Sequence, residues 1–246
     1  MQAVGEIVKF PQVGELNPQN YENNYKCQKC QDTGWITNGD TAYRCNCQWE
    51  RQIKYLLSFS GLEDFVNDYT FEKYKASEKW QKHIFDTAKN FLDDCEGNWF
   101  FIGGQVGCGK THICTAIVIE LLRRVISCQY MLWRDESVKL KAAVNDYSQY
   151  EKMIDKFKKV RCLYIDDFLK VGGNGTVTQG DINLAFELLN YRKNKKLITL
   201  ISTEKNIDDI LNIDEAIGSR IVEMTGKKYC IEIAKDRSKN MRLRQK

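Results

Sequence analysis

Residues 99–111, with the sequence WFFIGGQVGCGKT, constrain the fold of this chain more than any other segment. They match the phosphate-loop pattern G-x-x-x-x-G-K-[ST], and they lie between an apolar run typical of a strand and the apolar run ICTAIVIELL, which is typical of a helix. The glycines let backbone N–H groups turn inward onto phosphates, and the positive end of the following helix adds to the attraction. The segment therefore predicts a strand, a phosphate-binding loop and a helix.

The loop supplies the candidate residues for binding ATP or ADP. Lys110 is expected to reach the β- and γ-phosphates, and the Thr111 hydroxyl is expected to be a ligand of Mg²⁺. A glycine-rich turn without a ligand is the alternative, and the flanking strand and helix disfavour it. The candidate nucleotide-binding residues are Gly104, Gln105, Val106, Gly107, Cys108, Gly109, Lys110, Thr111 and His112.

A second segment, residues 160–168 (VRCLYIDDF), is an apolar run that ends in two carboxylates. Ligands of parallel α/β sheets gather at the carboxyl ends of the strands. Asp166 is therefore expected to hold Mg²⁺ through its water shell, and Asp167 is expected to orient or deprotonate the attacking water. The alternative is a turn with two solvated acids.

Apolar runs and helix-length amphipathic segments alternate from residue 69 onward. This alternation predicts an α/β fold with a parallel sheet covered by helices on both faces. The predicted strands are residues 98–103, 128–133, 160–166, 197–203 and 228–233. Residues 170–180 are rich in glycine and predict a mobile loop, after which Asp181 is expected to be the N-cap of a helix.

About a dozen residues follow the last predicted strand, which leaves little or no room for a helical lid domain. This segment, KDRSKNMRLRQK, is expected to be a basic tail. The alternative is that Arg237 or Arg242 acts as a second sensor of the nucleotide.

Four cysteines form two closely spaced pairs, Cys27-x-x-Cys30 and Cys45-x-Cys47, separated by fourteen residues. Four thiolates in two tight turns suit tetrahedral zinc, and a segment this short buries so little that the metal would supply its folding free energy. Free cysteines or an iron–sulfur cluster are the alternatives. Trp35 and Tyr43 lie between the pairs, either on a contact surface or over the small core. The other six cysteines are expected to be buried hydrophobic residues.

Composition places the protein among globular proteins, since 43% of its 246 residues are hydrophobic and 28% are charged. The N-terminus lacks the features of a signal peptide, and no apolar run is long enough to span a membrane, so a cytoplasmic location is expected. We expect three regions: a flexible arm at residues 1–26, a zinc module with a linker helix at residues 27–65, and an ATPase domain at residues 66–246.

Four motifs in order, GGQVGCGKT, LYIDDF, LLNYRKNKKLITLISTE and AIGSRI, resemble AAA+ ATPases of the DnaC/DnaI helicase-loader type. The resemblance covers about residues 69–234. It implies that Thr203, or Ser202 beside it, senses the γ-phosphate. It also implies that Arg220 is an arginine finger offered to a neighbouring copy, so that the ATPase domains self-associate; the alternative for Arg220 is a surface salt bridge.

The segments CQKCQDTGWI and YRCNCQ also resemble the zinc-bearing N-terminal region of DnaI-like and phage-encoded loaders. The resemblance implies an ATP-dependent loader that places a hexameric DnaB-type replicative helicase on single-stranded DNA during replication initiation. The first alternative is an IstB-like ATPase helper of a transposase. The second is a zinc-binding adaptor that binds nucleotide and hardly hydrolyses it.

The net charge of +4 permits a nucleic-acid partner without requiring one. Two basic runs at predicted helix ends either line a channel for single-stranded DNA or form solvated faces that complement the helix dipole. These runs contain Lys156, Lys158 and Lys159, and then Arg192, Lys193, Lys195 and Lys196.

Overall fold

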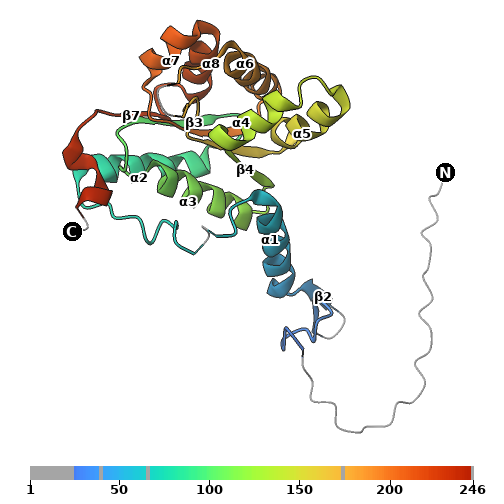
Figure 1. Ribbon diagram of the computed structural model, residues 1–246. Coiled ribbons are helices and arrows are strands. Elements are labelled where there is room, and N and C mark those ends of the chain that lie inside the picture. Colours follow the sequence, from blue (N-terminus) through green and yellow to red (C-terminus); the bar gives the residue numbers. More distant parts are fainter. Residues whose placement is uncertain (1–24, 39–40, 65–66, 173–174, 245–246) are drawn as a thin grey trace, which may run out of the picture. The chain divides into compact units, whose positions relative to one another are not determined.

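The computed structural model describes residues 25–38, 41–64, 67–172 and 175–244 (Figure 1). Most of the predicted arm, residues 1–26, lies outside these ranges. The chain divides into two compact units, Met1–Gln48 and Trp49–Lys246. The three-region organisation expected from the sequence stays a prediction, and its boundary near residue 65 differs from this division.

The N-terminal unit contains a hairpin of two antiparallel strands, β1 (Trp35–Asn38) and β2 (Thr41–Arg44). Helix α1 (Asn46–Ser60) begins in this unit and continues into the second. A linker helix is expected from the sequence within residues 27–65, and α1 agrees with it, although several of its apolar side chains lie outside the described part of the chain.

The second unit is built on a five-stranded sheet with the order β4-β5-β6-β3-β7, and every pairing in it is parallel. Each predicted strand is confirmed to within two residues. The strands are β3 (Trp99–Gly104), β4 (Cys128–Leu132), β5 (Cys162–Asp166), β6 (Ile198–Ser202) and β7 (Cys230–Ile233).

Helices cover both faces of this sheet, which confirms the predicted α/β sandwich (Figure 1). One face carries α2 (Lys79–Asp93) and α3 (Lys110–Arg123). The other carries α4 (Trp133–Ala142), α5 (Tyr147–Lys159), α6 (Gln179–Asn194), α7 (Ile207–Ile213) and α8 (Glu215–Thr225).

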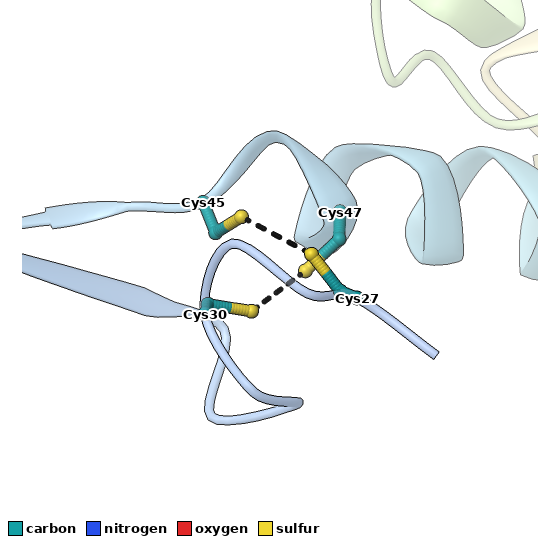
Figure 2. Close-up of side chains that lie close together, drawn as sticks. All are labelled: Cys27, Cys30, Cys45 and Cys47. Atoms are coloured by element: carbon teal, nitrogen blue, oxygen red, sulfur yellow. Dashed lines mark hydrogen bonds between the residues drawn. The ribbon is translucent and has the colours of Figure 1, made fainter. Parts of the chain in front are cut away.

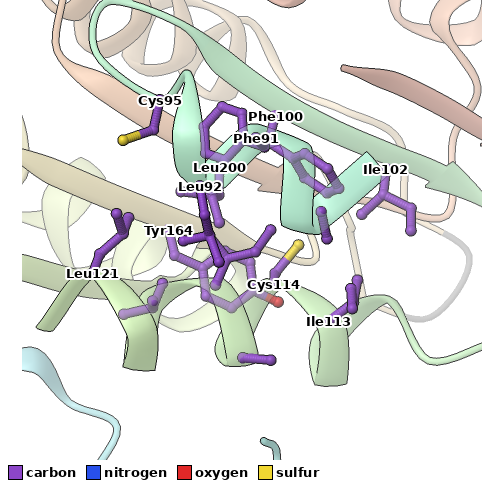
Figure 3. Packing of buried hydrophobic residues seen from close by; sticks show 14 of the residues in the cluster. Phe91, Leu92, Cys95, Phe100, Ile102, Ile113, Cys114, Leu121, Tyr164 and Leu200 are labelled. Atoms are coloured by element: carbon purple, nitrogen blue, oxygen red, sulfur yellow. The ribbon is translucent and has the colours of Figure 1, made fainter. Parts of the chain in front are cut away.

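The two hydrophobic cores follow from the alternation of side chains along each strand. In β3, Phe100 and Ile102 point into the core beneath α2 and α3, which Figure 3 shows with Phe91 of α2 packed nearby. The residues between them, Trp99 and Phe101, belong to the opposite core. A strand buried on both faces has no polar positions, which explains the continuous apolar run WFFI.

The start of α6 differs from the prediction. Thr178, not Asp181, is the N-cap, and its hydroxyl accepts a hydrogen bond from the backbone N–H of Asp181. The Asp181 carboxylate accepts in return from the backbone N–H of Thr178 and also pairs with Lys141. This reciprocal capping box begins the helix three residues earlier than expected, because an acidic residue at the third helical position also satisfies the first backbone donors.

Arg192 lies on α6 and is completely buried. Its guanidinium donates to the carbonyl oxygens of Phe157 and Val160 at 2.8 and 2.9 Å and to that of Ile198 at 2.5 Å. The first two carbonyls lie at the C-terminal end of α5, where helix carbonyls lack intrahelical partners. Burial lowers the pKa of Arg192 to about 10. The expectation that this residue belongs to an exposed basic run was therefore wrong.

The C-terminal segment is also ordered as far as residue 244. The basic C-terminal segment expected from the sequence forms two short 3₁₀ helices, Arg237–Lys239 and Met241–Leu243, and the expectation of little or no helical lid stays a prediction. Within the described part of the chain, no helix has the length and apolar character needed to cross a membrane.

Candidate active site and metal centre

The phosphate loop connects β3 to α3 at the carboxyl edge of the sheet. Gly104 and Gly109 both adopt positive φ angles, +102° and +93°, which are strained for other residues. A Cβ on Gly104 would also lie 2.0 Å from the carbonyl oxygen of Ile233 in β7. Only glycine fits this position, because the loop passes directly against the neighbouring strand.

Lys110 is the first residue of α3, and its side chain folds back over the loop. The ammonium group donates to the carbonyl oxygens of Gly104 and Gln105 at 3.0 and 2.6 Å. The side chain is buried, so its charge lies inside the loop where phosphates would bind. The loop carbonyls hold the ammonium at the site where a lysine compensates phosphate charge.

The predicted magnesium ligands come together across two elements. The Thr111 hydroxyl on α3 donates to the Asp166 carboxylate at the end of β5, with an oxygen–oxygen distance of 3.3 Å. Asp166 is buried, and it also accepts hydrogen bonds from the hydroxyls of Ser202 and Tyr130. A hydroxyl and a carboxylate at this spacing form a donor set that suits Mg²⁺ with several retained waters.

Asp167 lies on the rim of the same cavity with a positive φ of 53°. Its carboxylate pairs with the Lys170 ammonium at 3.1 Å, and Lys170 also pairs with Glu204 at 2.7 Å. Burial is the largest influence on the pKa of Lys170 and lowers it, but the combined effect of the two carboxylates raises the pKa overall. Lys170 thus bridges the ends of β5 and β6, and the role of Asp167 toward water stays a prediction.

The predicted sensor, Thr203, points away from this carboxylate. Its buried hydroxyl donates to the carbonyl oxygen of Phe168 at 2.8 Å. The hydroxyl of Ser202 contacts Asp166 instead, and the Tyr164 hydroxyl lies 3.2 Å from that of Ser202. Of the two residues proposed from the sequence, Ser202 is therefore the one beside Asp166, and the sensor role itself stays a prediction.

The cavity at the phosphate loop has a volume of about 590 Å³. Its walls include the loop, residues 68–69 and 73–75, and Met241 and Arg242 from the C-terminal segment. The backbone N–H of Met241 donates to the Gly107 carbonyl at 2.9 Å. The C-terminal segment therefore contributes to the cavity at the phosphate loop, and Arg242, one of the two arginines considered as a second sensor, lies in its wall, whereas Arg237 is not among the lining residues.

His112 lies on the wall of this cavity between two tyrosine rings. Its ring centroid is 5.2 Å from that of Tyr69 and 5.3 Å from that of Tyr74, and its Nε2 lies 2.8 Å from the carbonyl oxygen of Thr70. Burial lowers the pKa of His112, which favours the neutral ring at physiological pH.

The remaining loop residues have structural contacts. The Cys108 thiol is buried and donates to the Gln105 carbonyl oxygen at 2.9 Å, while Val106 is exposed on the rim. The Gln105 side chain accepts from the backbone N–H of Asp236 at 2.7 Å. This bond is a further attachment of the C-terminal segment to the loop.

Sequence reasoning missed Tyr130 and Lys170. Lys170 follows Asp167 by three residues, so a turn after the strand would bring the two together, and this signal was available. No sequence signal predicted the role of Tyr130, because its proximity to Asp166 depends on the pairing of β4 with β5.

The four cysteines of the N-terminal unit converge on one point, with all four sulfur atoms within 4.8 Å of one another (Figure 2). The Sγ atoms of Cys30 and Cys47 are 3.3 Å apart and those of Cys27 and Cys45 are 3.7 Å apart, and none of them forms a disulfide. Tetrahedral zinc with bonds of about 2.3 Å places its sulfur ligands about 3.8 Å apart, close to these values. The cluster is thus a zinc-type site.

Hydrogen bonds fix the turn that carries Cys27 and Cys30. The Asp32 carboxylate accepts from the backbone N–H groups of Lys26 and Cys27, both at 3.0 Å, and so closes the first turn. The backbone N–H of Gly34 donates to the Cys30 sulfur. A backbone hydrogen bond from Cys30 lowers the pKa of Cys27 to about 7, whereas the hydrogen bond with the Cys30 side chain raises the pKa of Cys47.

Trp35 and Tyr43 are about half exposed, with 46% and 54% of their surfaces accessible, so they do not cap the small core. Ile36 packs against the cysteines instead. The other prediction about cysteines holds, since five of the six downstream residues are buried and Cys230 is partly buried.

Arg220 lies on α8, where its guanidinium donates to the Asn190 side chain and to the Ala216 carbonyl and stacks over the Phe186 ring at 4.4 Å. These contacts hold the arginine within its own chain without a carboxylate partner among the described residues. Its predicted role toward a neighbouring copy stays a prediction.

The basic runs are mostly paired. Lys156 and Lys158 contact Glu136 and Glu187, at 3.1 and 2.5 Å. Lys159 contacts Asp155 at 2.5 Å, and Lys193 contacts Glu223 at 2.6 Å.

Comparison with known proteins identifies the family of this chain. Residues 36–246 match the model of the family described as IstB-like ATP binding protein. The chain is 30% identical over 228 residues to the phage-like element PBSX protein XkdC of Bacillus subtilis (strain 168), covering 87% of this chain and 85% of that protein.

A more distant relative is the replicative helicase loader DnaC of Escherichia coli (strain K12), which is 23% identical over 167 residues, or 67% of this chain and 65% of DnaC. The crystal structure of DnaI superposes with a TM-score of 0.57 and 19% identity over 74% of this chain and 96% of that chain, which supports the fold. The protein has a P-loop fold whose phosphate loop lies beside Asp166, and it is an AAA+ ATPase with replication-related relatives. It belongs to the IstB-like ATP binding protein family.

Proposed function

We propose that this protein uses ATP-controlled assembly to load a hexameric DnaB-type replicative helicase onto single-stranded DNA during replication initiation. The observation that carries the proposal is the similarity of two thirds of the chain to DnaC, a protein named as a replicative helicase loader. The phosphate loop and Asp166 supply the site through which ATP would control the assembly.

Arg220 supports self-association of the ATPase units. Its contacts with Asn190 and Ala216 use three of the five N–H donors of the guanidinium within the described structure. The stacking on Phe186 restricts the plane of the group. An arginine fixed in this way is preorganised to stabilise charge on a phosphoryl group held by a neighbouring copy.

The proposal includes contact with single-stranded DNA, and a second cavity, of about 600 Å³, is the candidate route for the strand. Four cationic side chains line it, together with two carboxylates: Arg134, Lys139, Lys141 and Lys170, with Asp135 and Asp181. Three of these cations already form ion pairs within the chain, so a bound strand would have to displace carboxylates: Lys139 pairs with Glu136, Lys141 with Asp181, and Lys170 with Asp167 and Glu204. DNA affinity is then expected to fall steeply with salt and to depend little on sequence. Affinity that does not change with salt would contradict this route for the DNA.

The test is size-exclusion chromatography of the full chain with the replicative helicase of the same organism, with and without ATP. We expect the two proteins to elute together, with ATP changing the amount of complex. Lys110→Ala is expected to abolish the effect of ATP, and Lys193→Ala, which removes a surface lysine, serves as the matched control. Separate elution in both conditions would overturn the proposal.

The second candidate is an ATPase helper of a transposase, which the description of the matching family favours. The matched region begins at residue 36 and excludes Cys27 and Cys30, so the complete cysteine site is additional to what the family model covers. We take this added site to favour the loader. Elution with a transposase, and not with the helicase, would favour the helper.

A nucleotide-binding adaptor is the third candidate. If Lys110→Ala left every partner complex intact, ATP would be dispensable for assembly and the adaptor would replace the loader as the better explanation.

A further inference from the structure

The Asp166 carboxylate is held on both of its oxygen atoms. Oδ1 accepts from the hydroxyls of Thr111 and Ser202 and from the backbone N–H of Asp167. Oδ2 accepts from the hydroxyl of Tyr130 at 3.1 Å. The donors come from α3, β6, the turn after β5, and β4, so four segments of the fold meet at one carboxylate.

Tyr130 reaches Asp166 because of the strand register. Leu132 is the residue of β4 that pairs with Asp166, and Tyr130 lies two residues earlier, on the same face of the sheet. Its phenol ring packs against Tyr164 with ring centroids 5.4 Å apart. On the other side, a Cβ placed on Gly61 would lie 3.7 Å from the Tyr130 Cβ, so the chain there runs directly against this residue. The tyrosine is therefore fixed by packing independently of the carboxylate.

The bonds to Asp166 differ in what happens to them when a metal binds. Thr111 is expected to turn its oxygen to Mg²⁺ and to leave Asp166. Ser202 and the Asp167 backbone N–H then remain on Oδ1, and Tyr130 is the described donor on Oδ2. A carboxylate anchored through both oxygens does not rotate about its Cβ–Cγ bond, whereas one anchored on a single oxygen does.

We propose that Tyr130 is a positioning residue for magnesium, because its hydroxyl fixes the orientation of the Asp166 carboxylate that holds the ion's water shell. Hydrogen-bond partners of metal-binding carboxylates commonly change metal affinity by about 10- to 100-fold. The inference concerns the metal site of the ATPase and does not depend on the loader role.

Tyr130→Phe tests the inference in the full-length protein, since it removes one hydroxyl and keeps the ring. Mn²⁺ replaces Mg²⁺ as the probe, and electron paramagnetic resonance measures its binding to the protein–ADP complex. We expect Mn²⁺ affinity to fall about 10-fold. ADP affinity measured in EDTA is expected to stay within about twofold, because Tyr130 contacts no part of the phosphate loop in the hydrogen bonds described.

A second readout is the magnesium dependence of ATP hydrolysis. The half-saturating Mg²⁺ concentration is expected to rise in Tyr130→Phe, and excess Mg²⁺ is expected to restore the rate. A general loss of structure would not be reversed by metal, and circular dichroism checks that the variant is folded.

Tyr150→Phe is the matched control. The Tyr150 hydroxyl donates to the Glu187 carboxylate at 2.5 Å, so the variant removes the same type of bond between α5 and α6, outside the nucleotide cavity. We expect its Mn²⁺ affinity to equal that of the unchanged protein. Unaltered Mn²⁺ affinity in Tyr130→Phe, or an equal loss in both variants, would overturn the inference.

Discussion

In the N-terminal unit, or cysteine unit (Met1–Gln48), the buried hydrophobic cluster consists of three cysteines, with Cys27 and Ile36 packed against them. The second unit, or ATPase unit (Trp49–Lys246), has a large hydrophobic cluster on each face of its sheet. Both short strands of the hairpin expose nearly all of their residues, while every residue of β3, β5 and β6 is buried. The described residues of this unit bury too little to stabilise it, and a metal bound by the four sulfur atoms would supply the missing stability.

The two units also differ in where their reactive side chains lie. In the cysteine unit the same four side chains would supply both the fold and the metal site. In the ATPase unit the reactive groups lie at the edge of a sheet that is already stabilised by apolar packing. Function and stability are therefore expected to be separable in the second unit and inseparable in the first.

Removal of zinc should have the largest effect. Chelation is expected to unfold the cysteine unit, because structural zinc contributes about 10–16 kcal/mol to the folding of small zinc domains. The ATPase unit should keep its thermal transition. Limited proteolysis with mass spectrometry would locate the cleavages, and metal analysis should find one zinc per chain.

The variant Cys27→Ser should reproduce the effect of chelation, with Cys230→Ser as the control outside the cluster. If the cysteine unit resisted protease equally well without metal, the metal would not be the source of its stability.

Arg192→Ala should give the largest loss of stability within the ATPase unit. The change leaves the carbonyl oxygens of Phe157, Val160 and Ile198 without their donor, and it opens a cavity. We expect the free energy of unfolding to fall by about 3–5 kcal/mol. Urea denaturation measures it, and Lys193→Ala, whose ion pair with Glu223 is partly exposed, should cost below about 1 kcal/mol. A similar loss in the two variants would show that the buried hydrogen bonds of Arg192 contribute little to the stability of this unit.

Lys110→Ala tests the separation of function from fold. Hydrolysis of ATP is expected to fall by at least about 100-fold, since the ammonium is the charge placed to stabilise the transferred phosphoryl group. The urea midpoint should change little, because the ammonium contacts only loop carbonyls. Steady-state phosphate release measures the first quantity. Near-normal ATP hydrolysis by Lys110→Ala would show that the catalytic site does not include Lys110.

Asp181→Asn should have the smallest effect, about 1 kcal/mol, through loss of the charge at the start of α6. Burial is the largest influence on the pKa of Asp181 and raises it, yet the bonds from Lys141 and Thr178 outweigh it and the pKa is lowered overall. Because the folded pKa is lowered, the stabilisation is complete above the unfolded value of about 4 and is lost as the pH falls through the lower, folded value.

The measurement for this prediction is the difference in unfolding free energy between Asp181→Asn and the unchanged protein, at several pH values. The difference should shrink below about pH 4. If it stayed constant there, the carboxylate charge would not be the source of the stabilisation.

Much of the ATPase unit followed from local patterns. The five apolar runs became the five strands because each run carries its own burial preference, and the phosphate loop is specified by glycines that no other residue replaces at those φ angles. The cysteine spacing likewise predicted the convergence of four sulfur atoms, because two short turns bring their own ligands together.

Other features required the packed chain. The strand order placed Tyr130 of the edge strand beside Asp166, and the packing of α6 against α5 converted Arg192 from a candidate for DNA contact into a buried cap of a helix end. The C-terminal segment joined the nucleotide pocket through the bond between Met241 and Gly107.

The sequence by itself determined the elements and the local sites, since propensity, periodicity and motif spacing act over a few residues. The tertiary structure decided the distant contacts that no motif predicts, such as those of Tyr130 and Arg192, because those contacts depend on strand order and on helix packing, and neither is encoded within a single segment.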